Sequence, residues 1–296
     1  MSLNIKNKYS GEIRHSCIKG SYSLTLICLL FFLSFITNEI SGQGNLLITP
    51  RRVVFEGSTR SIDLNLANTG SDTAIYAISL VQIRMKEDGG FETITEPDSG
   101  QMFADRNIRF FPRSVTLGPG ETQVLKVQLY RTNQLKPGEY RSHFYFRAVP
   151  KVRPLGEEAP LVDSNAISVR LVPIFGITIP VIIRVGASTT SIKITNLKLD
   201  LTNSDEPVFS FIFRRSGNMS VYGDLTVDYI STQGAITRVA IANGVAVYTP
   251  NITRKFSLKL NRIVGVDYRS GTLRIIYSAP SDVKPVRFAE AELMLN

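Results

Sequence analysis

Apolar and polar residues alternate one by one along most of the chain from residue 45 onward. This period of two is typical of β-strands with one buried face, and the segments are rich in branched and aromatic residues. Turn-forming residues separate the segments at 68–70, 88–90, 117–120 and 136–138. We expect a first series of strands that includes 62–67, 75–83, 123–129 and 142–149. Spacing of this kind over about 100 to 140 residues predicts an immunoglobulin-like β-sandwich.

One alternating run, at residues 169–184, is longer than a single buried strand requires. At about 3.3 Å per residue it would extend about 50 Å. Two interpretations stay open. The run is either two consecutive core strands with a kink at Gly176 or Pro180, or a strand that extends beyond its own domain. Its apolar residues of one parity are Val169, Leu171, Phe175, Ile177 and Ile179.

A second series of alternating segments follows the small-residue stretch 185–190, which we interpret as a linker. No segment after residue 42 has a sustained helical period. The pattern predicts an all-β chain with a first immunoglobulin-like domain at 43–186 and a slightly smaller β-sandwich at 187–296. The expected strands of the second domain are 191–195, 208–213, 223–230, 245–248, 256–260 and 271–277.

Residues 1–42 have a different composition from the rest of the chain. Basic residues precede an apolar block at 24–36, and small and polar residues follow it up to Gly42. This is the order of a secretory signal peptide, and the block is short for a membrane span. We expect cleavage near Gly42 and no stable membrane insertion of the mature chain. An uncleaved anchor is the alternative.

Charge and cysteine content limit the partners of the exported chain. Cys17 and Cys28 both lie in the leader, so the mature protein would contain no disulfide. The leader holds four Lys/Arg and two Asp/Glu, which leaves +7 of the net charge of +9. The basic residues are scattered along the expected strands without an aromatic-interleaved basic segment. We therefore expect no nucleic-acid partner.

The residues do not indicate an active site. Beyond the leader the chain has one histidine, His143, and no cysteine, so a single chain cannot form a zinc site of the His/Cys type. His143 is interpreted as a structural or surface residue. Nucleotide-binding loops and an EF-hand spacing are missing from the sequence. We expect no catalytic residue, no metal and no cofactor. A carbohydrate-acting enzyme is a poor fit because there is no tryptophan and no convincing carboxylate pair.

The order of several segments resembles the periplasmic pilus-assembly chaperones of chaperone-usher pathways. The form of residues 139–143, Glu-Tyr-Arg-Ser-His, is similar to the archaic, or spore-coat-U-associated, branch of that family. The resemblance extends over about 45–186, and it rests on order and spacing because each motif alone is weak. The segments that carry it are 48–57, 64–68, 111–123, 135–150 and 179–184.

The resemblance implies a fold and a mechanism. The fold would be two immunoglobulin-like sandwiches in a boomerang, or L-shaped, arrangement. The mechanism would be donor-strand complementation, in which the chaperone lends a strand to a pilin-like subunit that lacks its last one. The lent strand would cover an aggregation-prone groove and edge of the subunit. The donor residues implied are Val169, Leu171, Phe175 and Ile177.

The resemblance also implies a cationic site for the C-terminal carboxylate of the subunit. Arg52 lies at the family's arginine position on the first strand, and guanidinium suits a carboxylate because its planar fork can donate to both oxygens. The usual lysine of the later strand is replaced by Pro180. We therefore expect Arg141, on the neighbouring strand, to be the second cation.

The implied partners are a pilin-like subunit and an outer-membrane usher in the periplasm. Association of two free copies through the exposed strand is also physically allowed. The alternative function is that of an exported two-domain adhesin or pilus subunit. Such a subunit should carry a free N-terminal donor extension and lack a final strand, whereas this chain is already strand-like at Ile48 and retains the later strand.

Overall fold

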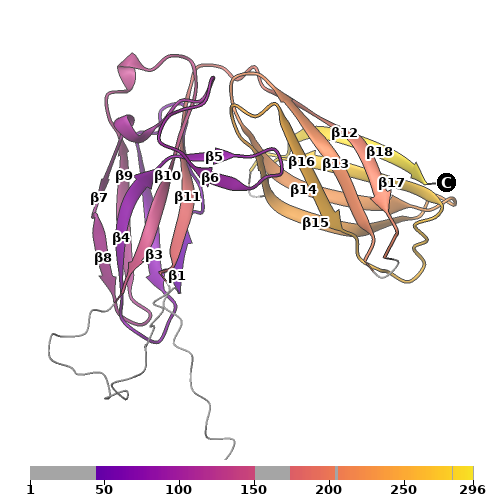
Figure 1. Cartoon of the computed structure of the whole chain (residues 1–296), viewed down its shortest axis with the longest axis horizontal. Coiled ribbons are helices and arrows are strands. Elements are labelled where there is room, and N and C mark those ends of the chain that lie inside the picture. Colours follow the sequence, from indigo (N-terminus) through magenta and orange to yellow (C-terminus); the bar gives the residue numbers. More distant parts are fainter. Residues whose placement is uncertain (1–44, 151–173, 204–205, 282, 296) are drawn as a thin grey trace, which may run out of the picture. The chain divides into compact units, whose positions relative to one another are not determined.

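The computed structural model describes residues 45–150, 174–203, 206–281 and 283–295. These residues form two β-sandwiches, one from the strands before residue 186 and one from the strands after residue 190 (Figure 1). The prediction of an all-β chain with two sandwiches is confirmed. Helical structure in the described part is limited to two 3-10 turns, η1 (Asp105–Asn107) and η2 (Thr132–Gln134). The expected leader and its cleavage site lie outside the described residues.

Two sheets form the first sandwich. One has the strand order β1, β3, β9, β7 and the other β2, β11, β10, β4, β8. The first sheet contains β1 (Leu46–Thr49), β3 (Ser61–Asn68), β9 (Thr122–Leu129) and β7 (Ile108–Phe111). The second contains β2 (Val53–Phe55), β11 (Gly176–Val185), β10 (Gly138–Val149), β4 (Ala74–Val81) and β8 (Ser114–Leu117).

The core of the first sandwich lies between its two sheets. Leu64 and Leu66 of β3 are fully buried, and so are Phe144 and Phe146 of β10 in the opposite sheet. Phe110 of β7 meets Phe144 edge to face, with the ring centroids 5.0 Å apart. Alternate residues of each strand therefore point inward, which is the arrangement that the period of two predicts.

A short hairpin extends from the first sandwich to the second. It consists of β5 (Ile83–Met85) and β6 (Phe91–Thr93). The backbone N–H of Lys255, in the second sandwich, donates to the carbonyl of Glu87 in the turn of this hairpin at 2.6 Å. The side-chain amide of Asn251 donates to the carbonyl of Met85 at 2.8 Å. The hairpin thereby connects backbone of both sandwiches.

The second sandwich begins after a short connection, because β11 ends at Val185 and the next strand begins at Ser191. Its core includes Phe209, Phe211 and Phe213, which are buried against the opposite sheet. The last strand, β18, was not among the strands expected from the sequence. One sheet contains β12 (Ser191–Asp200), β13 (Val208–Ser216) and β16 (Thr253–Lys259). The other contains β15 (Ile236–Val247), β14 (Val221–Ile230), β17 (Gly271–Ser278) and β18 (Arg287–Leu295).

Candidate functional site

Strand β11 has one fully paired edge and one partly paired edge. It runs antiparallel to β10 over its whole length. On its other edge β2 pairs with it in parallel, at residues 181–183 only. Within the part of the chain that the structure describes, residues 176–180 have no strand partner on this edge.

The backbone groups on this free edge follow from the register. The N–H of Ala148 in β10 donates to the carbonyl of Phe175 at 2.9 Å, and these two residues continue the antiparallel register of β10 and β11. Hydrogen-bonded and non-hydrogen-bonded pairs alternate in an antiparallel ladder. Gly176, Thr178 and Pro180 therefore direct their backbone groups away from β10. Gly176 and Thr178 offer both N–H and C=O, whereas Pro180 offers only its carbonyl.

The two faces of β11 have different surroundings. Ile179, Val181 and Ile183 are buried in the first core, and Ile177 is half-buried against the same core. Phe175 has the same parity but precedes the strand, and it is 49% exposed. The core-facing side of the strand thus continues as apolar surface beyond the core. Of the expected donor residues, Val169 and Leu171 lie outside the described residues.

The opposite face of β11 lines a small pocket with a volume of about 220 Å³. Thr178 and Pro180 form one wall of this pocket. The lining also includes the cations Arg51 and Arg52 and the rings of Phe91, His143 and Tyr248, so the pocket combines positive charge with aromatic rings. It lies directly beside the unpaired edge of β11.

Arg52 enters the pocket from the residue before β2. Its Nη1 donates to the hydroxyl of Tyr248 at 3.0 Å. The guanidinium also lies over the rings of Tyr222 and Tyr248, at 4.5 and 5.4 Å from their centroids. Its Nη2 is buried without a hydrogen-bond partner among the described residues. A buried charged donor that lacks a partner is costly, so Arg52 is suited to receive an anion.

Arg141 contacts the same tyrosine but is almost completely buried. Its side chain, in β10, is 2% exposed, and its guanidinium lies 4.1 Å from the centroid of the Tyr248 ring. Nη2 donates to the carbonyls of Ile83 and Thr249, while Nε and Nη1 have no partner in the described part of the chain. Burial lowers the pKa of Arg141 to about 10, so it remains cationic at neutral pH. The structure thus brings both predicted arginines to Tyr248, although Arg52 lines the pocket and Arg141 does not.

His143 lies in the pocket wall and is buried. Of the two possibilities expected from the sequence, a structural or a surface residue, the structure therefore has the structural one. His143 is 4% exposed, and its Nδ1 has no partner among the described residues. Burial lowers its pKa to about 3, and the positive charges of Arg141 and Arg52 act in the same direction. His143 is therefore neutral near pH 7.

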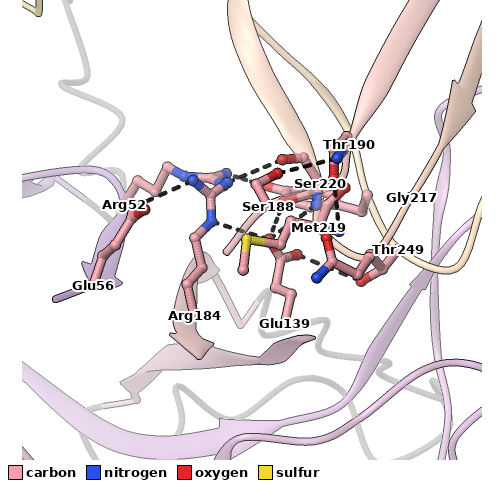
Figure 2. Close-up of polar contacts among 12 residues, drawn as sticks. Arg52, Glu56, Glu139, Arg184, Ser188, Thr190, Gly217, Met219, Ser220 and Thr249 are labelled. Carbon is pink, nitrogen blue, oxygen red and sulfur yellow. Dashed lines mark hydrogen bonds and ion pairs between the residues drawn. The ribbon is translucent and has the colours of Figure 1, made fainter. Parts of the chain in front are cut away.

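A buried carboxylate links the two sandwiches (Figure 2). The Oε2 atom of Glu139, in β10, accepts hydrogen bonds from the backbone N–H of Ser220 at 3.0 Å and from its hydroxyl at 2.6 Å. Arg184 of β11 donates from Nε to the same carboxylate at 3.3 Å and from Nη2 to the carbonyl of Ser220 at 3.0 Å. The side chain of Glu139 is 0% exposed, so these donors replace its hydration.

Sequence reasoning did not identify Glu139, Ser220 or Tyr248 as site residues. The signal for Glu139 was the polar cluster at 139–143 inside an alternating strand, because buried polar groups in a strand require partners. Tyr248 follows the end of β15 at a turn, and nothing in its local sequence distinguishes it from a core tyrosine. Its position between two guanidinium groups depends on long-range packing.

A search of the described residues finds no group of three or more His, Cys, Asp or Glu side chains that could hold a metal ion. In the same residues, no helix is long and apolar enough to cross a membrane.

No protein-family model and no curated protein sequence matches the chain. Solved structures of pilus chaperones do have a similar fold. They include the YadV chaperone, with 12% identity and a TM-score of 0.43 over 85% of this chain and 100% of that chain.

Two others are a chain of the CsuC–CsuE chaperone–tip subunit complex from archaic Csu pili of Acinetobacter baumannii and the CupB2 chaperone of Pseudomonas aeruginosa. The Csu chain has 12% identity and a TM-score of 0.43, over 84% of this chain and 98% of that chain. CupB2 has 12% identity and a TM-score of 0.40, over 84% of this chain and 100% of that chain. At these values, function is inferred from the residues and geometry of this chain.

Proposed function

We propose that the protein is a periplasmic chaperone that binds a pilin-like subunit by donor-strand complementation and delivers it to an outer-membrane usher. The observation that carries the proposal is the free outer edge of β11 at residues 176–180. A strand edge with unpaired N–H and C=O groups is a template for another chain. In strand addition, the backbone bonds provide affinity and alternate side chains provide specificity.

The side chains near this edge are suited to the same role. Phe175 and the exposed Ile174 precede β11 at the end of its free edge. Phe175 and Ile177 have the same parity as the core residues of β11, so on this proposal they present an apolar row to the groove of the subunit. Val169 and Leu171 would extend the row, as the sequence pattern indicates.

The pocket beside the edge provides the carboxylate anchor of the proposed mechanism. Arg52 lines it with a guanidinium that has one unpartnered nitrogen, and Arg141 adds a second positive charge on the same tyrosine ring. Pro180, at the position where the family has a lysine, supplies no charge. The anchor would thus consist of two arginines, with Arg52 in contact with the carboxylate and Arg141 raising the local positive potential.

Other parts of the proposal rest on the sequence. The order of residues 1–42 supports export to the periplasm, and the apolar strand supports a binding function. The proposed chaperone would act without catalysis and without ATP. Delivery to an usher follows from the family resemblance. The chaperone itself would require no cofactor.

A co-purification experiment tests the function. The protein is expressed with the pilin-like proteins of its own genome, and bound chains are identified by mass spectrometry. The Phe175→Asp variant should lose the bound subunit but keep its thermal unfolding curve. Phe111→Asp is the matched control, because Phe111 is 76% exposed on β7, in the other sheet. Equal loss with both variants, or assembly of the protein into a polymer with itself, would contradict the chaperone function.

A further inference from the structure

The pocket beside Arg52 is larger than a carboxylate anchor requires. Its volume is about 220 Å³. A water molecule accounts for about 30 Å³ of liquid volume, so a carboxylate group would fill only a small part of this space. The remaining volume is sufficient for a side chain as well.

Three aromatic rings surround this extra space. The centroids of Phe91 and His143 are 6.3 Å apart, those of Phe91 and Tyr248 are 6.4 Å apart, and those of His143 and Tyr248 are 6.3 Å apart. His143 and Tyr248 are buried, whereas Phe91 is 56% exposed at the end of the β5–β6 hairpin. Phe91 therefore has a ring surface that is free to contact another ring in an edge-to-face or offset arrangement.

The charge of the pocket restricts the kind of ligand. The guanidinium of Arg52 already lies over Tyr222 and Tyr248, and its Nη2 has no partner in the described chain. A cationic ligand would be repelled by Arg52, even though aromatic rings alone can bind cations. An anionic group beside an apolar or aromatic group fits both features.

The topology also determines which part of a bound chain reaches the pocket. The free edge of β11 ends where β2 begins to pair, with Val53 opposite Val181. A strand added to residues 176–180 cannot continue past that point, because β2 occupies the edge. Arg52 is the residue before β2 and lines the pocket together with Thr178 and Pro180. A chain terminus suits this position better than a continuous segment.

We infer that the pocket binds the whole last residue of the partner chain, with its carboxylate on Arg52 and an aromatic side chain against Phe91. The inference rests on the proposed chaperone function and names the class of partner: chains that end in an aromatic residue. Phe91 is then a specificity residue, and Arg52 is the anchor.

Because the protein contains no tryptophan, a tryptophan-terminated peptide gives a tryptophan fluorescence signal to which the protein itself does not contribute. The probe is N-acetyl-glycyl-threonyl-tryptophan as the free acid. Its competitors are the same peptide ending in phenylalanine, the same peptide ending in glycine, and the C-terminal amide of the phenylalanine peptide. The purified protein should bind the phenylalanine acid about fivefold or more tightly than the glycine acid. Phe91→Ala should remove this preference, whereas Phe111→Ala, a matched exposed control, should keep it.

The outcomes distinguish failure of the aromatic specificity from failure of the carboxylate anchor on which it rests. If the glycine and phenylalanine acids compete equally and Phe91→Ala changes nothing, the aromatic specificity is wrong and the anchor stands. If the amide competes as well as the acid and Arg52→Ala has no effect, the carboxylate anchor itself is wrong. If the protein binds none of the peptides, both are overturned.

Discussion

The carboxylate of Glu139, in the first sandwich, accepts both the backbone N–H and the hydroxyl of Ser220, in the second. Both bonds reach the same oxygen, Oε2, and Thr249 contributes its hydroxyl to Oε1 at 3.4 Å. Since the carboxylate is excluded from water, these donors and Arg184 take the place of its hydration. The contact between the sandwiches at this point is polar and specific in its geometry.

Replacing Glu139 should therefore lower stability substantially. Breaking a buried ion pair by removing one partner costs about 3 to 5 kcal/mol, and Arg184 retains partial solvent contact and a second carboxylate, Glu56, at 3.5 Å. We expect Glu139→Ala to reduce the free energy of unfolding by about 2 to 4 kcal/mol in urea titrations. Glu292→Ala, at an exposed position of β18, should change it by less than about 0.5 kcal/mol. Similar losses in the two variants would contradict the assigned role of the network.

Two neighbouring proline substitutions should have opposite effects. The N–H of Thr178 points to the free edge, so Thr178→Pro loses no hydrogen bond of the described chain but removes a donor that the subunit would use. It should abolish subunit capture with little change in stability. The N–H of Ile177 points to β10, so Ile177→Pro removes a ladder hydrogen bond and should destabilise the protein by about 1 to 3 kcal/mol. Thermal unfolding and co-purification separate the two effects, and normal subunit capture by Thr178→Pro would exclude pairing along this edge.

The two arginines should affect subunit affinity more than surface arginines do. A hydrogen bond between charged groups contributes about 1.5 to 3 kcal/mol, so we expect Arg52→Ala to weaken subunit binding about 10- to 100-fold. Arg141→Ala should also weaken it, and Arg141→Met, which preserves most of the buried volume, distinguishes lost charge from lost packing. Arg60→Ala, an exposed control with the same change of net charge, should bind normally in titration calorimetry. Unchanged affinity for both Arg52→Ala and Arg141→Ala would refute the anchor.

The neutral, buried state of His143 predicts a pH dependence of stability. Its pKa falls from 6.5 in the unfolded chain to about 3 in the folded one, chiefly because of burial. Between these values the unfolded state binds the proton and the folded state does not, so the free energy of unfolding decreases as the pH falls below 6.5. The decrease is at most about 1.4 kcal/mol per pH unit, or about 2 kcal/mol at pH 5. His143→Phe should show a shallower decline between pH 7.5 and 5 in urea titrations, and parallel declines would disprove the assignment.

The sequence was sufficient to predict much of the fold because alternation depends on local burial. Strands β3, β9 and β10 coincide with segments whose every second residue is apolar, and their inward residues form the core. Strand β18 was missed although Ala289, Ala291, Leu293 and Leu295 alternate along its inner face, because alanine has a low preference for strands and marks that face only weakly.

The site was predicted less completely, for a physical reason. Arg52 and Arg141 were identified from the resemblance, and they do meet at one ring. The ring itself, Tyr248, comes from the other sandwich and is 107 to 196 positions away in sequence from the two arginines. The alternation of apolar and polar residues within a strand gives no information about contacts between positions so far apart. The direction of each backbone group on β11 likewise depends on register, which a single sequence does not specify.

The missing N–H of Pro180 limits where a partner strand can begin and end. If the partner strand were shifted by two residues toward β2, one of its carbonyls would face the ring of Pro180 instead of an N–H donor. The end of the partner strand would also overlap with Val53 of β2. A strand that slid the other way would withdraw its end from Arg52. On the proposed mechanism, the edge of β11 would therefore fix the distance between the paired segment of the partner and its last residue. Two partners with the same apolar motif at different distances from their ends would be told apart by length alone.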